Sequence, residues 1–240
     1  MPKLKADLHT HTSEDPRDII KYDSYCLIDK AALLGFDVLA ITNHDLVTCN
    51  KKLFNYAEKK DILLIPGMEA TLSGKHVLIL NPEFNKNLNG RSIRDLPKLK
   101  SDKNLIIAPH PFFPQAKSLK SLFYTYAPYF DAIEFSHCYN NLFNFNKKTI
   151  QVSEQQNLPL IGTSDCHFLW EFGSTYSLID SKKDPQSIIE AVKNGKIEVC
   201  STPLPFLSML RIAYKYFQLK LLMAINRRVG KESGKKNQVN

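Results

Sequence analysis

Eight short apolar runs, separated by longer mixed segments, constrain the fold of this chain more than any other feature. The runs occupy residues 4–8, 37–41, 62–66, 76–80, 104–108, 132–135, 158–162 and 175–179. Their length and aliphatic content predict buried strands. Several runs are continuously apolar, as strands are when helices cover both faces of a parallel sheet. The chain is therefore expected to build an α/β core.

Helix-like segments lie between most of these runs. They cover residues 18–35, 48–60, 92–101, 118–126, 143–157 and 184–194. A repeated strand-then-helix order predicts parallel βα units. About seven such units in about 200 residues suit a barrel, and an open doubly wound sheet is the alternative. We therefore predict one α/β domain over residues 1–200.

The remaining residues, 201–240, form a basic tail. Residues 211–240 carry +7 of the net charge of +8, so the first 210 residues are nearly neutral. Apolar residues keep helical spacing over 205–228, which predicts a C-terminal amphipathic helix. The Gly-, Lys- and Asn-rich end is expected to be disordered. Packing of the helix on the barrel is the first expectation, and contact with a membrane surface or nucleic acid is the alternative.

Cysteine usage and the first residues predict the compartment. The five cysteines form no Cys-x-x-Cys pair, which favours a reducing cytoplasm. The sequence contains no uncharged apolar window of about 18 residues, so no membrane-spanning helix is expected. The segment from Met1 to Asp7 lacks the apolar core of a signal peptide. A cytoplasmic protein with no obligate protein partner is expected.

Histidines mark the ends of the predicted strands. Six of the seven histidines lie at a strand boundary, and most follow the C-terminal end of the strand. Six of them follow the strands at 4–8, 37–41, 104–108, 132–135 and 158–162: His9, His11, His44, His110, His137 and His167. In parallel α/β folds these ends form the active-site face. We therefore expect the imidazoles to meet at one place.

The local spacings point to metal ions. His9 and His11 are separated by one residue, so in an extended segment their side chains project to the same side. Asp165 and His167 repeat this spacing, and Glu69 follows another predicted strand, where a carboxylate could bridge two cations. Neutral imidazoles with carboxylates suit zinc, iron or manganese rather than calcium.

Five motifs, in this order, resemble the PHP (polymerase and histidinol phosphatase) family of metal-dependent phosphoesterases. They are Asp7-Leu8-His9-Thr10-His11-Thr12, Ala40-Ile41-Thr42-Asn43-His44-Asp45, Pro66-Gly67-Met68-Glu69, Pro109-His110-Pro111 and Gly162-Thr163-Ser164-Asp165-Cys166-His167. Each motif alone is weak, whereas the ordered set is specific. The resemblance covers residues 4 to about 200 and implies a distorted (β/α)7 barrel.

The resemblance also implies two or three divalent metal ions, Zn, Mn or Fe. The first ion would be bound by His9, His11, Glu69 and Asp165, and Glu69 would bridge to a second ion bound by His110 and His76. A third ion would be bound by His44, His167 and an acid from the loop after the first motif.

The acidic ligand of the third ion is one place where the chain departs from the family pattern. Asp15 lies six residues after His9 and is our first choice, and its neighbour Glu14 is the alternative. The second motif has Asn43 where family members often have Asp. His137 matches none of the ligand motifs.

The expected function is hydrolysis of phosphate esters by a metal-activated water. The substrate would be a small phosphorylated metabolite, a nucleotide or an oligonucleotide end. His137 or Asp45 could protonate the leaving group, and Arg17 and Lys75 are candidate phosphate contacts. Cys166 is interpreted as a packing residue. The alternatives are a metal-dependent amidohydrolase acting on a C–N bond and a non-catalytic metal-binding accessory module.

Overall fold

The computed structural model describes residues 2–80, 91–212, 214 and 218. The chain divides into two compact units, Met1–Pro203 and Leu204–Asn240. In the second unit residues 206–212 are helical. Most of the predicted 205–228 helix and of the basic tail lies outside the described residues, including Lys215, Lys220, Arg227 and Arg228. The functional assignment of the two segments stays a prediction.

Nine strands form the sheet of the first unit, counted over its described residues. They are β1 (Leu4–Thr10), β2 (Val38–Ile41), β3 (Leu63–Leu72), β4 (Lys75–Leu80), β5 (Leu105–Ala108), β6 (Ala132–Ser136), β7 (Leu160–Thr163), β8 (Thr175–Ile179) and β9 (Ile197–Ser201). The first eight match the predicted runs. The ninth was not predicted, because it is not an apolar run: Glu198 is exposed and its other four residues are only half-buried.

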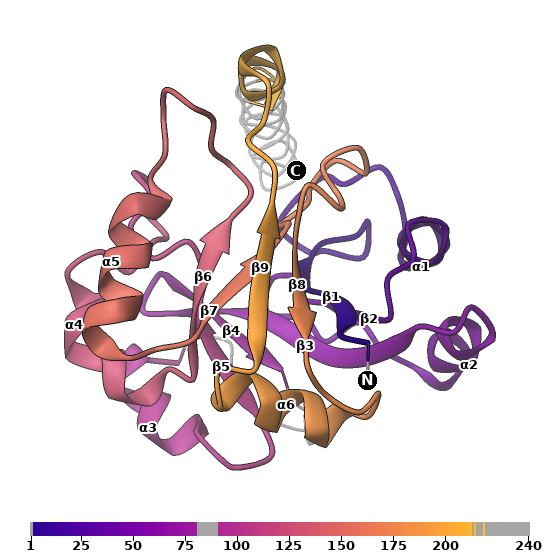
Figure 1. Cartoon of the computed structure of the whole chain (residues 1–240), viewed down its shortest axis with the longest axis horizontal. Helices are drawn as coiled ribbons and strands as arrows, with labels where there is room; N and C mark the ends of the chain where they lie inside the picture. Colours follow the sequence, from indigo (N-terminus) through magenta and orange to yellow (C-terminus); the bar gives the residue numbers. More distant parts are fainter. Residues whose placement is uncertain (1, 81–90, 213, 215–217, 219–240) are drawn as a thin grey trace, which may run out of the picture. The chain divides into compact units, whose positions relative to one another are not determined.

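Helices connect these strands and lie around the outside of the sheet (Figure 1). They are α1 (Ser24–Leu33), α2 (Lys51–Lys59), the 3₁₀ turn η1 (Ile93–Asp95), α3 (Leu96–Leu99), α4 (Leu122–Tyr126), the 3₁₀ turn η2 (Ala127–Tyr129), α5 (Asn146–Gln156) and α6 (Pro185–Lys193). Side-chain caps define three of the starts: Asp23 accepts from the amide of Cys26, Asn50 from Leu53 and Asp184 from Ser187. Each such cap stabilises its helix by about 1 kcal/mol.

The sheet curls into a nearly closed barrel. The strand order is β7-β6-β5-β4-β3-β2-β1-β8-β9, so β7 and β9 are the edge strands of the sheet. The edge strand β7 also contacts β8: the Ser177 hydroxyl donates to the carbonyl of Gly162 and accepts from its amide, both at 2.9 Å. A Cβ atom on Gly162 would lie 2.7 Å from the carbonyl oxygen of Tyr176, so glycine permits this approach. The predicted barrel class is confirmed.

The expectation of parallel strands throughout is wrong at four pairs. Parallel pairing joins β1 to β2, β2 to β3, β5 to β6 and β6 to β7. Antiparallel pairing joins β3 to β4, β4 to β5, β1 to β8 and β8 to β9. The reason at β3 and β4 is a tight turn in place of a helix, with Ser73 and Gly74 at φ angles of 48° and 77°. A hairpin turn of this kind reverses the chain, and only a longer crossover keeps neighbouring strands parallel.

The barrel interior is filled by aliphatic side chains. Residues from β1 to β8 pack with Ile188, Ile189 and Val192 of α6 in one buried cluster. Two further clusters place the helices α1 and α2, and α4 with α5, against the sheet. In the described part of the chain, no helix is long and apolar enough to cross a membrane.

Candidate metal centre

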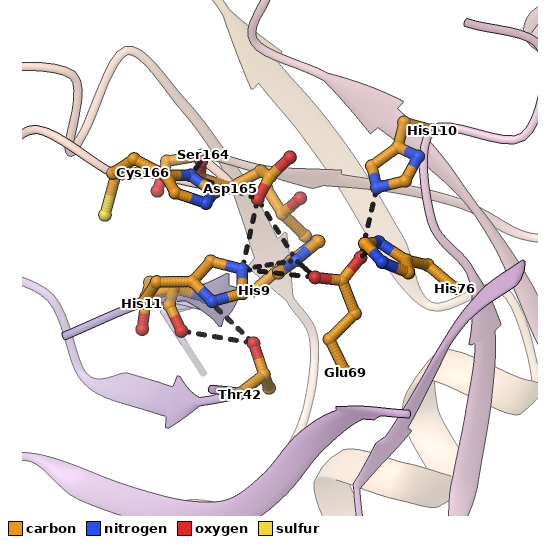
Figure 2. Close-up of polar contacts among 12 residues, drawn as sticks. His9, His11, Thr42, Glu69, His76, His110, Ser164, Asp165 and Cys166 are labelled. Atoms are coloured by element: carbon orange, nitrogen blue, oxygen red, sulfur yellow. Dashed lines mark hydrogen bonds and ion pairs between the residues drawn. The ribbon is translucent and has the colours of Figure 1, made fainter. Parts of the chain in front are cut away.

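The histidines and carboxylates singled out by the sequence meet at one end of the barrel. His9 lies in β1, Glu69 in β3 and His76 in β4, and the others lie in loops that follow β1, β2, β5 and β7. Figure 2 shows His9, His11 and Asp165 on one side of Glu69, and His76 and His110 on the other. Three groups of residues offer ligand atoms within 4.8 Å of one another: His9, His11, Glu69 and Asp165; His11, Asp15 and His44; and His44, Glu69 and His76.

The first group has the dimensions of a metal site. The Nε2 atoms of His9 and His11 are 3.1 Å apart, and each lies 3.2 Å from Oδ1 of Asp165. Oε2 of Glu69 lies 3.6 Å from Nε2 of His9 and 3.4 Å from Nε2 of His11. A tetrahedron with edges of about 3.3 Å has corners about 2.0 Å from its centre, which is the usual zinc–ligand distance. The four side chains therefore fit one divalent cation.

Glu69 directs its two oxygens to different histidines. Oε2 faces the first group and also lies 3.1 Å from Nε2 of His44. Oε1 lies 2.6 Å from Nδ1 of His76 and 3.1 Å from Nε2 of His110. A carboxylate with one oxygen toward each group is the arrangement that a bridge between two cations requires.

The third predicted group is only partly assembled. Oδ2 of Asp15 lies 2.8 Å from Nδ1 of His44 and 3.1 Å from Nδ1 of His11. The alternative acid, Glu14, is turned away and accepts from the Ser24 hydroxyl at 2.8 Å. The ring of His167 lies beside that of His11, with centroids 4.5 Å apart, and its Nε2 lies 3.0 Å from Oδ2 of Asp18.

Glu134 orients two of the imidazoles. Its Oε1 accepts from Nδ1 of His9 at 2.6 Å and from the Thr163 hydroxyl at 2.5 Å, and its Oε2 accepts from the amide of His110 at 2.6 Å. Because Nδ1 of His9 carries the proton, Nε2 keeps its lone pair for a cation. Gln115 lies 2.9 Å from Nδ1 of His110 and leaves the Nε2 of that ring directed at Glu69.

Backbone strain occurs at two of the candidate ligands and directly after a third. His110, Asp165 and Asp45 have φ angles of 30°, 44° and 53°. Such left-handed conformations are costly for residues other than glycine and persist where the surroundings enforce them. The strain therefore marks the loops that present the candidate ligands.

The carboxylates of the cluster lack cationic side chains. Over the described part of the chain, no lysine or arginine pairs with Glu69, Asp165 or Glu134, and Glu69 and Asp165 lie among imidazoles. Burial opposes the charge on His9, but Asp165, Glu134 and Glu69 outweigh it and raise its pKa. Burial likewise opposes ionisation of Asp165, but His9 and His11 outweigh it and hold its pKa well below its usual range. Carboxylates that have imidazoles but no lysine or arginine as partners, as Glu69 and Asp165 do, are an environment in which divalent cations supply the missing positive charge. The residues fit divalent metal ions.

The candidate catalytic residues take different positions. Asp45 accepts from the amide of Thr71 at 2.6 Å and pairs with Nη2 of Arg17, so both its oxygens are engaged. Both ring nitrogens of His137 are buried, without a hydrogen-bond partner among the described residues. Burial lowers the pKa of His137 to about 4, and the charges that act on it include Asp165 and Glu134, so its neutral ring lies beside the cluster.

Two other residues named from the sequence are used structurally. Lys75 donates from Nζ to the carbonyls of Ala116 and Ser118 at 2.7 and 3.0 Å, so it ties the start of β4 to a loop. Cys166 is fully buried, and the Tyr22 hydroxyl lies 3.3 Å from its Sγ. Burial raises the pKa of this thiol to about 12, in keeping with a packing role.

Sequence reasoning missed Glu134 and Asp18. Glu134 stands in the apolar segment Ala132–Ser136, and a lone acid in a buried strand was a usable signal. Asp18 lies beyond the spacing at which a third acid was sought, and only the folded loop brings it to His167.

A nearly closed α/β barrel with a cluster of histidines and carboxylates at its strand ends has the features of a metal-binding barrel. A family model described as PHP-associated matches residues 143–197. Two uncharacterized proteins of Methanocaldococcus jannaschii are 29% and 28% identical over 134 and 185 residues, which cover 48% and 72% of this chain and 72% and 69% of theirs.

Solved structures share the fold. A two-domain protein from Bacteroides vulgatus, containing a predicted PHP-like metal-dependent phosphoesterase, has a TM-score of 0.65 and 22% identity over 89% of this chain and 69% of its own. A lesion-specific endonuclease from Pyrococcus furiosus has a TM-score of 0.56 and 15% identity over 88% and 66%. An amidohydrolase from Chromobacterium violaceum has a TM-score of 0.53 and 17% identity over 68% and 87%. The resemblance seen in the motifs is thus confirmed: residues 143–197 match the PHP-associated family model, and the barrel fold is shared with solved PHP-like structures.

Proposed function

We propose that this protein hydrolyses phosphate esters with the help of two or three divalent metal ions. One observation supports this above all: four lone-pair donors, from His9, His11, Glu69 and Asp165, converge within 3.1 to 3.6 Å where the described residues provide no cationic side chain. Divalent ions bound there would lower the pKa of a bound water to about 7 and polarise a phosphoryl oxygen.

The ligands are assigned as follows. His9, His11, Glu69 and Asp165 bind the first ion, and Glu69 with His76 and His110 binds the second. Asp15 and His44 bind a third, together with His167, and Asp18 holds the ring of His167 through a contact of 3.0 Å. Glu134 keeps Nδ1 of His9 protonated, as its contact of 2.6 Å indicates.

Residues beside the ligands contact the phosphoryl oxygens and the leaving group of the substrate. Asp45 positions Arg17, whose remaining N–H groups contact the phosphoryl oxygens of the substrate. His137 stays neutral at pH 7, because burial lowers its pKa to about 4. Its N–H therefore suits hydrogen bonding to the leaving-group oxygen, and it is a poor imidazolium acid.

The substrate class is a small phosphorylated metabolite, a nucleotide or an oligonucleotide end. The likeness to an endonuclease supports inclusion of nucleotides and oligonucleotides among the candidates. The likeness to an amidohydrolase makes C–N bonds the second candidate for the same centre. A non-catalytic metal-binding module would assemble the same ligands without turnover.

Activity of the metal-depleted and reloaded protein tests the proposal. We expect p-nitrophenyl phosphate, nucleotides or short oligonucleotides to be hydrolysed only after zinc, manganese or iron is restored. Asp165→Asn should lower kcat/KM by about 100-fold or more, because it removes a ligand atom but keeps the side-chain shape. Asp29→Asn is the matched control, since Asp29 pairs with Lys60 at the surface.

Two outcomes would contradict the proposal. Phosphate-ester turnover that persists in the metal-free protein would refute the metal dependence. Turnover confined to a panel of amides, or none with any substrate, would favour the amidohydrolase or the accessory module.

A further inference from the structure

A pocket of about 340 Å³ opens next to the candidate metal centre. It is lined by Arg17, Thr71, Ser73, Gly74, Arg91 and Ser92. The lining thus contains two guanidinium groups and three hydroxyls, and it includes no acidic side chain of the described residues. Arginine with hydroxyl donors is the combination that proteins use to bind phosphate and carboxylate groups.

The pocket adjoins the metal centre through β3 and β4. Thr71 lies two residues after Glu69 in β3, so their side chains share a face, with Cα atoms roughly 7 Å apart. Thr71 is also directly opposite His76 in the β3–β4 register. Arg17 reaches the pocket while paired with Asp45, the residue that follows His44. The pocket is therefore close enough to the candidate ligands for one small substrate molecule to reach both.

Hydrogen bonds hold the two sides of the pocket together. The amide of Ser73 donates to the carbonyl of Arg91 at 3.1 Å, and the amide of Ile93 donates to the Ser73 hydroxyl at 3.1 Å. The hydroxyls of Ser73 and Ser92 are 3.3 Å apart. These contacts fix the segment that carries Arg91 to the β3–β4 turn, so the pocket is preformed.

One buried group in the pocket lacks a partner. The Thr71 hydroxyl oxygen is inaccessible and forms no hydrogen bond with any described residue. A buried hydroxyl without a hydrogen-bond partner is destabilising, so such groups usually find one. Because no described residue holds this hydroxyl, rotation of the Thr71 side chain would bring it to a ligand oxygen in the pocket, whereas the Thr71 amide already donates to Asp45 at 2.6 Å.

We propose that this pocket binds a second anionic group of the substrate, a phosphate or a carboxylate, while the phosphoryl group to be cleaved lies at the metal centre. This inference rests on the proposed function and deepens it. The two anionic groups would be separated by roughly 7 Å, the spacing of Glu69 and Thr71 along β3. The preferred substrate is then a compact, doubly anionic phosphate ester, and Arg91 selects it.

Kinetics on a matched set of esters test the selection. Propane-1,3-diol monophosphate carries one anionic group, its bisphosphate carries two, and 4-phosphooxybutanoate replaces the second phosphate by a carboxylate. We expect wild-type kcat/KM to be at least tenfold higher for one or both doubly anionic esters than for the monophosphate. The preferred one identifies the second group as phosphate or carboxylate.

Arg91→Gln should reduce this preference at least tenfold, and Thr71→Val should reduce it in the same direction. Arg94→Gln is the matched control, because Arg94 is exposed on the same segment and does not line the pocket. A preference that is absent from the wild type, or unchanged by Arg91→Gln, would overturn the inference.

A binding measurement separates failure of the pocket from failure of the proposed function. Inorganic phosphate is titrated calorimetrically into metal-free protein, in which the metal centre cannot retain it through cations. We expect Arg91→Gln to weaken phosphate binding at least tenfold and Arg94→Gln to leave it unchanged. If no ester is hydrolysed but this pattern holds, the pocket stands and the proposed function fails. Equal affinities of the wild type and Arg91→Gln would refute the pocket.

Discussion

Replacing Glu134 by glutamine tests how the ligand histidines are oriented. The wild-type carboxylate accepts three hydrogen bonds, from Nδ1 of His9 at 2.6 Å, from the Thr163 hydroxyl at 2.5 Å and from the His110 amide at 2.6 Å. Glutamine offers one acceptor oxygen and one NH₂ group. Either orientation of the amide therefore places a donor against a donor.

The two orientations have different costs. If the NH₂ group faces His9, the ring must accept at Nδ1, and its proton moves to Nε2, the atom that faces the cluster. If the NH₂ group faces the His110 amide, one buried backbone donor loses its partner at a cost of about 1–3 kcal/mol. We expect metal affinity to fall by about 10- to 100-fold. For a domain of this size, the loss of stability lowers the melting temperature by about 2–4 °C per kcal/mol.

Competition with a chelator measures the metal affinity, and calorimetry measures the melting temperature of the metal-free protein. Thr163→Val is the control, because it removes one contact of Glu134 and leaves the His9 proton in place. It should lower stability but keep metal affinity within about threefold. Wild-type metal affinity in Glu134→Gln would refute the assigned role of Glu134.

Three further predictions concern the contact of β7 with β8, the ionisation of Asp15 and the binding of metal. Gly162→Ala should destabilise the protein by about 1–3 kcal/mol in urea unfolding, because the added Cβ would lie 2.7 Å from the Tyr176 carbonyl oxygen; an unchanged midpoint would contradict the close approach of β7 and β8. In the metal-free protein, burial opposes ionisation of Asp15, but His11 and His44 outweigh it and hold its pKa well below its ordinary value of 3.8. Its contribution to stability is then present above about pH 4 and is lost as the pH falls further, so Asp15→Asn should flatten the acid limb of stability against pH, and an identical limb would count against the pairing. Chelation should lower the melting temperature, since free metal at 100 times its Kd stabilises a folded protein by about 2.7 kcal/mol, and a melting curve indifferent to metal would contradict the site.

Much of the fold could be predicted because strands that are buried on both faces leave a local signal. The runs at 76–80 and 104–108 were recognisable as strands from their aliphatic content. The strand at Ile197–Ser201 left no such signal, since it is only partly buried. The antiparallel direction of β4 was missed because the order of elements was read as uniform, although the turn between β3 and β4 is too short for a crossover.

The candidate site shows the same division. The histidine pair at His9 and His11 and the acid at Asp165 could be named from spacing, since residues separated by one position in extended backbone share a side. Glu134 and Asp18 could not be found by spacing, because each meets its histidine across the barrel: 125 positions separate Glu134 from His9, and 149 separate Asp18 from His167.

Local periodicity and the ordered motifs were sufficient to predict eight of the nine strands, the barrel class and the candidate metal ligands, because these properties depend on neighbours along the chain. Only the tertiary structure decided the strand directions and the orientation of the Glu69 carboxylate, which directs its two oxygens to different histidines. It also decided that Asp15 contacts the histidines while Glu14 is turned toward Ser24. These properties depend on which side chains the closed sheet brings together, and contacts across a barrel have no counterpart in the spacing of residues along the sequence.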